Sequence, residues 1–309
     1  MIAIVGAGMA GLSCAHQLVK TGQDVVVFDK GRGLGGRIAT RRTGFGSFDH
    51  GAQYATAKGD DFAGYLARLS IAGSAARWNL PGREKDRYVG SPGMTSLVKP
   101  LAENVTVHRE IEITGIRRSQ TDWHLTDASG TVFGPYTALV LTPPAPQTLN
   151  LLGDYAAAFP GLRDVKYAPC WTLMAAFDGS LKARETVIRG EGVLDWVACN
   201  SSKPGRDAMM ETWVAQASPC WSRDQLEQSK NEVARRMLAE MLVALDVPSR
   251  EAVYLQAHRW RYARVEQAVG QTFLFDRELN LGIAGDGLLG GRIEAAYESG
   301  HALGRHLSP

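Results

Sequence analysis

The chain has 309 residues and carries 34 lysines and arginines against 32 aspartates and glutamates. A folded chain of this length buries roughly 75% of the surface that its unfolded form exposes, so the core is ample and about two domains are expected. The net charge of +2 gives no electrostatic reason to expect a nucleic-acid or membrane partner. No apolar run approaches the roughly 18 residues that span a bilayer, no basic signal region precedes Gly6, and the four cysteines are scattered, so we expect a cytoplasmic protein.

The first 29 residues have the pattern of a strand, a glycine turn, a helix and a second strand. Residues 2–5 are a short apolar run, and residues 12–20 favour a helix that stops at Thr21-Gly22. Residues 25–28 form a continuous apolar run, which is typical of a strand buried on both faces. Together they predict one βαβ unit with a right-handed crossover.

The rest of the chain mixes strands and helices. The patterns predict a helix over 61–69, short strands over 105–133, a buried strand over 138–141, strands over 165–215, an amphipathic helix over 222–245, a buried strand over 281–284 and a helix over 292–306.

The glycine turn at Gly6, Gly8 and Gly11 has the spacing of a dinucleotide-binding motif. It follows a strand and opens a helix, so the backbone can approach a pyrophosphate while the helix N-terminus offers free N–H groups. Asp29 ends the next strand, where an acid binds ribose hydroxyls. This unit alone leaves two cofactors open, NAD and the ADP half of FAD.

A second glycine cluster over residues 30–37 favours the longer cofactor. An NAD-binding unit normally continues from its second strand into a helix, whereas this chain makes a glycine-rich excursion that carries Arg32 and Arg37. Glycines permit close backbone approach, and an arginine can bind phosphate oxygens with two N–H groups. We therefore expect FAD.

These motifs resemble those of the two-glycine-motif flavoproteins, a group that includes amine oxidases, phytoene desaturases and GDP-dissociation inhibitors. More narrowly, six segments in family order between residues 2 and 300 resemble the renalase family. They are residues 28–37, 49–54, 90–94, 194–196, 258–264 and 285–294. One departure is His50, where relatives carry an apolar residue, and we expect it to pack or make a polar contact.

The resemblance implies an α/β fold, α+β overall, in which a doubly wound, Rossmann-like FAD/NAD(P)-binding domain joins a mixed-sheet substrate domain. The implied arrangement is that of amine oxidases and p-hydroxybenzoate hydroxylase. The FAD-binding domain would be discontinuous and comprise residues 1–55, 91–150 and 265–309. The substrate-binding domain would comprise residues 56–90 and 151–264.

Noncovalent FAD is the implied cofactor. Asp286 would accept bonds from ribityl hydroxyls, and the helix that begins near Arg292 and Ile293 would present its positive end to the flavin. The implied cofactor-binding residues are Gly6, Ala7, Gly8, Met9, Ala10, Gly11, Asp29, Lys30, Gly35, Gly36, Arg37, Gly51, Ala52, Gln53, Tyr54, Ile113, Gly285, Asp286, Arg292 and Ile293.

The implied activity is the oxidation of 2- and 6-dihydro isomers of NAD(P) to NAD(P)⁺, with dioxygen reduced to hydrogen peroxide. Such a hydride transfer needs close stacking and no strong base, so we assign no catalytic side chain. The histidine spacing predicts no metal site. The alternatives are an amine oxidase or dehydrogenase on the same scaffold and a flavin-free binding protein. The candidate substrate-binding residues are Tyr54, Trp196, Asn200, His258, Arg259, Trp260 and Tyr262.

Overall fold

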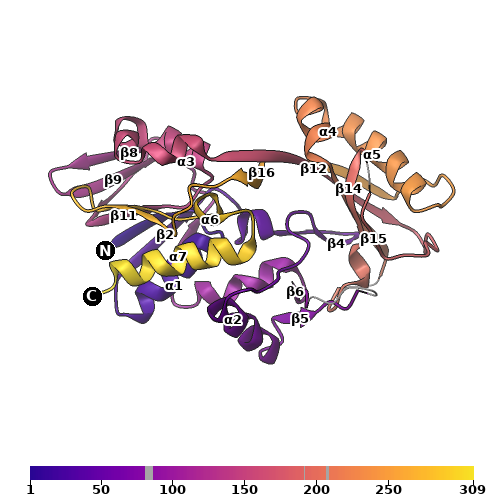
Figure 1. Ribbon diagram of the computed structural model, residues 1–309, viewed down its shortest axis with the longest axis horizontal. Helices are drawn as coiled ribbons and strands as arrows, with labels where there is room; N and C mark the ends of the chain where they lie inside the picture. Colours follow the sequence, from indigo (N-terminus) through magenta and orange to yellow (C-terminus); the bar gives the residue numbers. More distant parts are fainter. Residues whose placement is uncertain (81–85, 191, 207–208) are drawn as a thin grey trace.

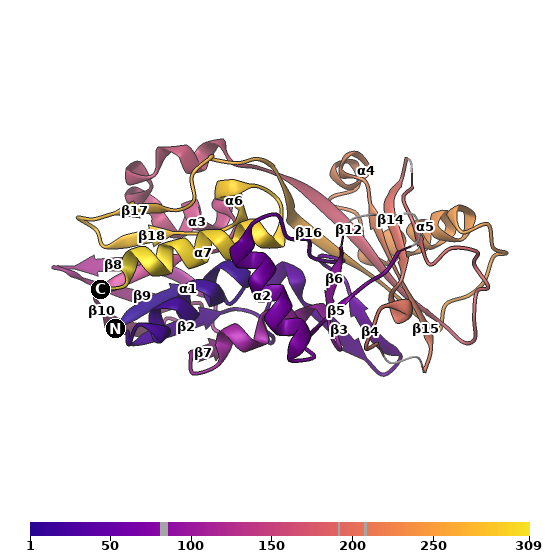
Figure 2. The ribbon, with the colours of Figure 1, turned by 60° about the horizontal axis from the view of Figure 1, so that its bottom comes forward.

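The computed structural model describes residues 1–80, 86–190, 192–206 and 209–309. Two lobes lie side by side along the longest axis, and both chain termini lie at the outer end of the first lobe (Figures 1 and 2). Residues 81–85, 191 and 207–208 of the predicted substrate-binding domain fall outside the described residues.

A six-stranded sheet organises the first lobe. Its strands, in spatial order, are β17 (Leu274–Asp276), β18 (Leu281–Ile283), β11 (Ala138–Leu141), β1 (Ile2–Val5), β2 (Val25–Asp29) and β7 (Thr106–Arg109). All neighbours pair in parallel except β17, which is antiparallel to β18. The carboxyl ends of β1, β2 and β11 therefore meet at one edge, where ligands bind in open parallel sheets.

Both faces of this sheet are covered, which explains the continuous apolar runs of its strands. One face packs on α1 (Met9–Lys20) and α7 (Ile293–Leu307), with α2 (Asp60–Ile71) beside them. The other face packs under α3 (Ala145–Leu152) and a three-stranded antiparallel sheet of β8 (Ile113–Ser119), β9 (Asp122–Asp127) and β10 (Val132–Tyr136). α1 and α7 run side by side, so the first and last helices belong to one layer (Figure 1).

The second lobe contains a five-stranded sheet. Its strands, in spatial order, are β13 (Val187–Ile188), β14 (Leu194–Cys199), β15 (Glu211–Ala217), β12 (Lys166–Phe177) and β16 (Tyr254–Gln267), and the recorded pairings are antiparallel. The long strands β12 and β16 extend from this sheet toward the first lobe (Figure 2).

Short elements complete the fold. Two hairpins consist of β3 (Thr40–Thr43) with β4 (Gly46–Asp49) and of β5 (Ala75–Arg77) with β6 (Tyr88–Gly90). A four-residue helix, α6 (Asp286–Leu289), precedes α7. Short segments of 3₁₀ helix are η1 (Gly36–Ile38), η2 (Met94–Leu97), η3 (Lys99–Ala102), η4 (Gly153–Ala158), η5 (Pro160–Asp164) and η6 (Asn200–Ser202).

The helix predicted over 222–245 is wrong as one element, because the structure divides it. It contains α4 (Pro219–Asp224) and α5 (Lys230–Ala244), which cover one face of the five-stranded sheet. Ser229 caps the second helix by accepting a hydrogen bond from the N–H of Glu232. The intervening backbone bonds to the sheet instead, since the carbonyl of Gln225 accepts from Trp171 Nε1 at 3.0 Å. Tertiary hydrogen bonds thus replace a helical turn that the periodicity favours.

Candidate functional site

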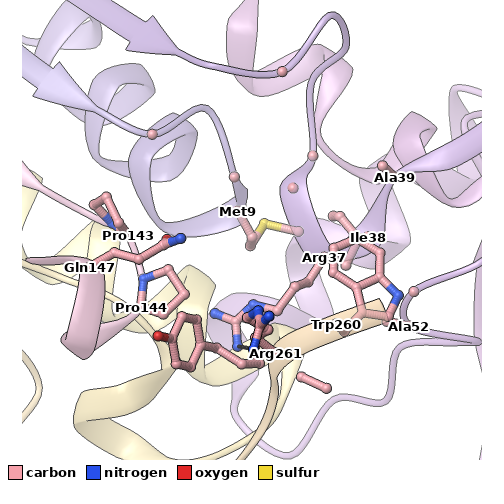
Figure 3. A pocket seen from close by; sticks show the side chains of 18 of the residues that line it. Met9, Arg37, Ile38, Ala39, Ala52, Pro143, Pro144, Gln147, Trp260 and Arg261 are labelled. Atoms are coloured by element: carbon pink, nitrogen blue, oxygen red, sulfur yellow. Dashed lines mark hydrogen bonds between the residues drawn. The ribbon is translucent and has the colours of Figure 1, made fainter. Parts of the chain in front are cut away.

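A cavity of about 1620 Å³ opens between the two lobes. Pockets for drug-sized ligands usually measure about 300–1,000 Å³, so this one has room for more than one such molecule. Its wall contains residues from Val5 to Ala296, which means that distant parts of the chain enclose it. In Figure 3 labelled residues from several elements surround the pocket, among them Met9, Arg37, Ala52, Pro143, Gln147 and Trp260.

The first glycine turn brings the N-terminus of α1 to this cavity. Gly6 adopts a φ of +106°, which side-chain-bearing residues rarely adopt, and a Cβ on Gly11 would lie 1.9 Å from the carbonyl oxygen of Gly6. Gly8, the N-cap of α1, lines the cavity, and no side chain caps the helix. The first turn of this 12-residue helix is therefore available to an anion in the cavity.

Asp29 ties the first glycine turn to the second glycine cluster. Its two carboxylate oxygens accept hydrogen bonds from the backbone N–H groups of Ala7 and Gly31, each at 2.6 Å. Asp29 also lines the cavity, and each of its oxygens keeps a second lone pair for a ligand hydroxyl. The acid is consequently both a structural link and a candidate ribose-binding group.

Arg37 and Asp286 join the two ends of the chain at the cavity wall. Arg37 follows β2 in η1, whereas Asp286 begins α6, and the guanidinium donates to both carboxylate oxygens at 2.6 and 2.8 Å. Burial opposes the charge of Arg37, but the charge of Asp286 and its hydrogen bonds prevail and raise the pKa of Arg37. A paired arginine of this kind remains a cation at the cavity.

The N-terminus of α7 reaches the cavity from the C-terminal part of the chain. Arg292 is the N-cap of this 15-residue helix, no side chain caps it, and Arg292 and Ile293 both line the cavity. The preceding helix α6 packs closely on β12, since a Cβ on Gly287 of α6 would lie 2.4 Å from the hydroxyl of Tyr167. Two uncapped helix N-termini, those of α1 and α7, therefore face one cavity.

These residues fit a dinucleotide that also carries a flavin. The N-terminus of α1 suits a pyrophosphate, Asp29 suits a ribose, and the N-terminus of α7 suits a ring that becomes negative on reduction. A Cβ on Gly8 or Gly33 would meet no protein atom within 4 Å, so backbone borders open space at these cavity-lining positions. The volume of about 1620 Å³ leaves room for such a cofactor.

Two histidines and a tryptophan form another part of the wall. The rings of His50 and His258 meet edge to face at 5.0 Å, and the ring of Trp260 lies 5.2 Å from His50 and 4.3 Å from His258. Trp260 Nε1 donates to the backbone carbonyl of His50 at 2.8 Å. The Nδ1 atom of His50 is buried and has no hydrogen-bond partner within the described residues.

Both imidazoles are neutral at physiological pH. Burial, followed by the charge of Arg41, lowers the pKa of His50 to about 4. Burial, followed by His50, Arg41 and Lys230, lowers the pKa of His258 to about 3. A neutral imidazole has one N–H donor and one acceptor nitrogen, so this wall can recognise a flat polar group without adding charge.

Most of the predicted cofactor-binding residues line this cavity: Gly6, Gly8, Met9, Ala10, Asp29, Lys30, Gly35, Gly36, Arg37, Gly51, Ala52, Ile113, Gly285, Asp286, Arg292 and Ile293. Ala7, Gly11, Gln53 and Tyr54 do not belong to its wall. Among the candidate substrate-binding residues, His258, Arg259, Trp260 and Tyr262 line it. Their roles toward ligands stay predictions.

Tyr54, Trp196 and Asn200 lie away from the cavity wall, so their positions do not support direct contact with a substrate there. The rings of Tyr54 and Trp196 pack on each other at 5.7 Å. Asn200 is fully buried and uses its amide to bond backbone groups of Asp49 and Ser47. Their contacts join segments far apart in the sequence, which local sequence patterns do not show.

Sequence reasoning missed a third strand end at the cavity. Thr142 and Pro143 directly follow β11, which pairs with β1, and both line the cavity together with Gln147 of α3. Parallel neighbours end at the same edge of the sheet, so the buried run over 138–141 was a usable signal. Arg41 and Lys230 were missed as well, because the fold alone brings them to the wall.

Comparisons with known proteins agree with this arrangement of an α/β dinucleotide-binding lobe and a second sheet. The N-terminal part, residues 4–69, matches the model of the NAD(P)-binding Rossmann-like domain. Residues 70–302, well over half of the chain, match the model of the flavin containing amine oxidoreductases. The chain therefore belongs to the flavin containing amine oxidoreductase family, and the predicted fold class is confirmed.

Curated relatives match over short segments only. A ribosomal RNA dihydrouridine synthase from Haemophilus influenzae is 51% identical over 45 residues, which is 15% of this chain and 11% of that protein. An L-amino acid oxidase from Cerastes cerastes is 49% identical over 41 residues, or 13% of this chain and 8% of that protein. The chain thus spans a small fraction of the length of the curated relatives it matches.

Solved structures share the fold over the whole chain. A candidate protoporphyrinogen oxidase from Exiguobacterium sp. 255-15 superposes with a TM-score of 0.78 and 13% identity, covering 99% of this chain and 98% of that one. Putrescine oxidase bound to putrescine gives a TM-score of 0.73 and 12% identity at the same coverage. At such identities the likeness concerns the fold.

No helix within the described residues is long and apolar enough to cross a membrane.

Proposed function

We propose that the cavity holds FAD noncovalently, with the pyrophosphate at the N-terminus of α1 and the flavin near the N-terminus of α7. The family is flavin-containing, and the two uncapped helix ends and Asp29 suit the cofactor. Cys170 lines the cavity, but burial raises the pKa of its thiol to about 11, which disfavours the thiolate that covalent attachment requires. The two lobes would correspond to a cofactor domain and a substrate domain with the boundaries expected from the sequence.

The substrates we propose are dihydro isomers of NAD(P). The observation that carries this choice is the excess of positive charge in the cavity wall on the β16 side. The carboxylates of Glu227 and Asp195 face five cations there: Arg41, Lys230, Arg259, Arg261 and Arg264. A cationic wall favours an anionic dinucleotide and disfavours a cationic amine. The resemblance of six segments to the renalase family supports the same choice.

The chain's own residues would bind and orient this substrate. Trp260 and the neutral imidazoles of His50 and His258 would pack against a flat ring and bond its polar substituent. Neutrality matters here, because a cationic imidazole would oppose the positive charge that develops when a dihydropyridine becomes aromatic. When bound, the flavin would supply the hydride acceptor, with dioxygen as the final oxidant; the hydride's two electrons and proton, together with one proton from water, would reduce dioxygen to hydrogen peroxide. No side-chain base is needed, since the substrate loses a hydride and keeps no extra proton.

Amine oxidation is the second candidate, and the family match favours it. Putrescine oxidase shares the fold, and a segment of L-amino acid oxidase shares about half of its residues with this chain. An amino acid carries a carboxylate that the cationic wall would also accept, whereas a diamine would meet repulsion there. The two candidates therefore predict different substrate charges.

The test is a visible spectrum of the purified holoprotein under anaerobic conditions. We expect 2- or 6-dihydroNAD(P) to bleach the flavin within seconds, and admission of air to restore it with one equivalent of hydrogen peroxide. Putrescine and L-amino acids should leave the flavin oxidised over the same period. Bleaching by an amine, with none by the dihydronicotinamides, would establish the second candidate instead.

A further inference from the structure

The cations on the substrate side of the cavity differ in how they are compensated. Arg259 and Arg261 share the carboxylate of Glu227 at 2.9 and 2.6 Å, and Arg264 lies 3.9 Å from Asp195. These arginines are therefore partly neutralised by the protein itself, which reduces what they can offer to a ligand.

Arg41 and Lys230 line the same cavity without an ion-pair partner in the described parts of the chain. Arg41 belongs to β3, and its guanidinium donates to the neutral amide oxygen of Gln256. Tyr254 donates to the same oxygen at 2.9 Å, so Arg41 is oriented by neutral groups and keeps further N–H donors free.

These two cations come from different elements and line the same cavity. Arg41 of the β3 hairpin bonds Gln256, which lies two residues before His258 on β16, and Lys230 begins α5. Burial lowers the pKa of His258, and the charges of Arg41 and Lys230 lower it further. Lys230 is the first residue of the 15-residue helix α5 and lines the cavity. The protein thus places uncompensated positive charge beside the neutral imidazole that lines the ring-binding wall.

We propose that Arg41 and Lys230 form a phosphate-binding subsite for the pyrophosphate of a dinucleotide substrate. This assignment rests on the proposed function. The substrate's ring would lie against His50, His258 and Trp260 while its phosphates bond the two cations. Arginine suits phosphate oxygens by its paired N–H groups, and lysine adds a point charge. The second phosphate site would be distinct from the one at α1, which serves the cofactor.

The experiment measures binding of ADP-ribose and of inorganic pyrophosphate to the FAD-loaded protein through changes in the flavin spectrum. Bound FAD fills the site at α1, so these probes report on a second site. We expect Lys230→Met and Arg41→Met each to weaken ADP-ribose binding about five- to tenfold. The matched control is Arg235→Met, which removes one exposed cation from α5 away from the cavity wall and should change affinity less than about twofold.

A phosphate-free substrate separates this subsite from a general loss of activity. In Lys230→Met, kcat/KM for the dihydro dinucleotide should fall by a larger factor than kcat/KM for dihydronicotinamide riboside, which has no pyrophosphate. Equal ADP-ribose affinity in wild type and in both variants would overturn the subsite. Lysine-dependent ADP-ribose binding in a protein that fails to oxidise any dihydronicotinamide would support the subsite and reject the proposed function.

Discussion

Replacing Asp49 should destabilise the protein far more than replacing its neighbour Lys203. The Asp49 carboxylate is fully buried and accepts from Lys203 Nζ and Arg206 Nε, each at 3.2 Å. Burial alone would raise the pKa of Asp49, but the two cations lower it from 3.8 to about 2. This lowering of the pKa by nearly two units corresponds to roughly 2.5 kcal/mol of folding stability. The contribution is present above about pH 4 and is lost as the pH falls toward 2.

The buried cluster of Asp49, Lys203 and Arg206 has one carboxylate for two cations, so its members contribute unequally to stability. Burial lowers the pKa of Lys203 from 10.5 to about 8, and the charge of Arg206 adds to this effect. Asp49 opposes the shift, but Lys203 shares this carboxylate with Arg206. Asp49→Asn leaves two buried cations uncompensated and should cost about 3–5 kcal/mol. Lys203→Met leaves a matched pair and should cost less than about half as much.

Urea unfolding followed by tryptophan fluorescence at pH 7 measures both costs. The pKa of Lys203 is lower in the folded state, so the unfolded state binds more protons between about pH 8 and 10.5. The free energy of unfolding of the wild type should therefore gain a contribution from Lys203 as the pH rises through that range. Lys203→Met should lack that gain. A Lys203→Met cost equal to or above that of Asp49→Asn would refute the reasoning.

Three further perturbations test other parts of the structure. Gly11→Ala should abolish flavin binding, because its Cβ would lie 1.9 Å from the carbonyl oxygen of Gly6, and the flavin content of the purified protein measures this. Glu294→Ala should cost about 3 kcal/mol in urea unfolding, since the buried carboxylate accepts two backbone N–H bonds at 2.5 and 2.7 Å before α2; a cost below about 1 kcal/mol would contradict it. Burial lowers the pKa of His50 to about 4, so the contribution of neutral His50 to stability is full above about pH 6.5 and falls as the pH drops toward 4. His50→Leu should flatten this decline in the free energy of unfolding. A variant with the wild-type pH profile of stability would contradict the assignment.

The cofactor half of the site could be predicted from the sequence because its signals are local. A glycine turn between a strand and a helix, followed by an acid at the next strand end, has one compact geometry. The structure places Gly6, Gly8 and Asp29 around one cavity, as the spacing predicts. The fold class followed from the same elements, and residues 2–5, 25–28 and 138–141 are central strands.

The substrate half could not be predicted in the same way, since it depends on contacts between distant elements. His50 and Trp260 are 210 residues apart, and the fold brings their rings to within 5.2 Å of each other. Trp196 and Asn200 do not line the cavity, and their buried contacts with Tyr54 and Asp49 are ones that no local pattern encodes. Lys230 reaches the wall because the chain leaves the helical path between α4 and α5.

The most direct test of the central claim is a crystal structure of the protein grown with FAD and ADP-ribose. The account predicts FAD in the cavity between the lobes, with its pyrophosphate at the N-terminus of α1 and its flavin ring beside the N-terminus of α7. ADP-ribose should occupy the remaining space with its phosphates at Arg41 and Lys230. A cavity that admits no FAD, or FAD bound with its pyrophosphate away from α1, would contradict the account.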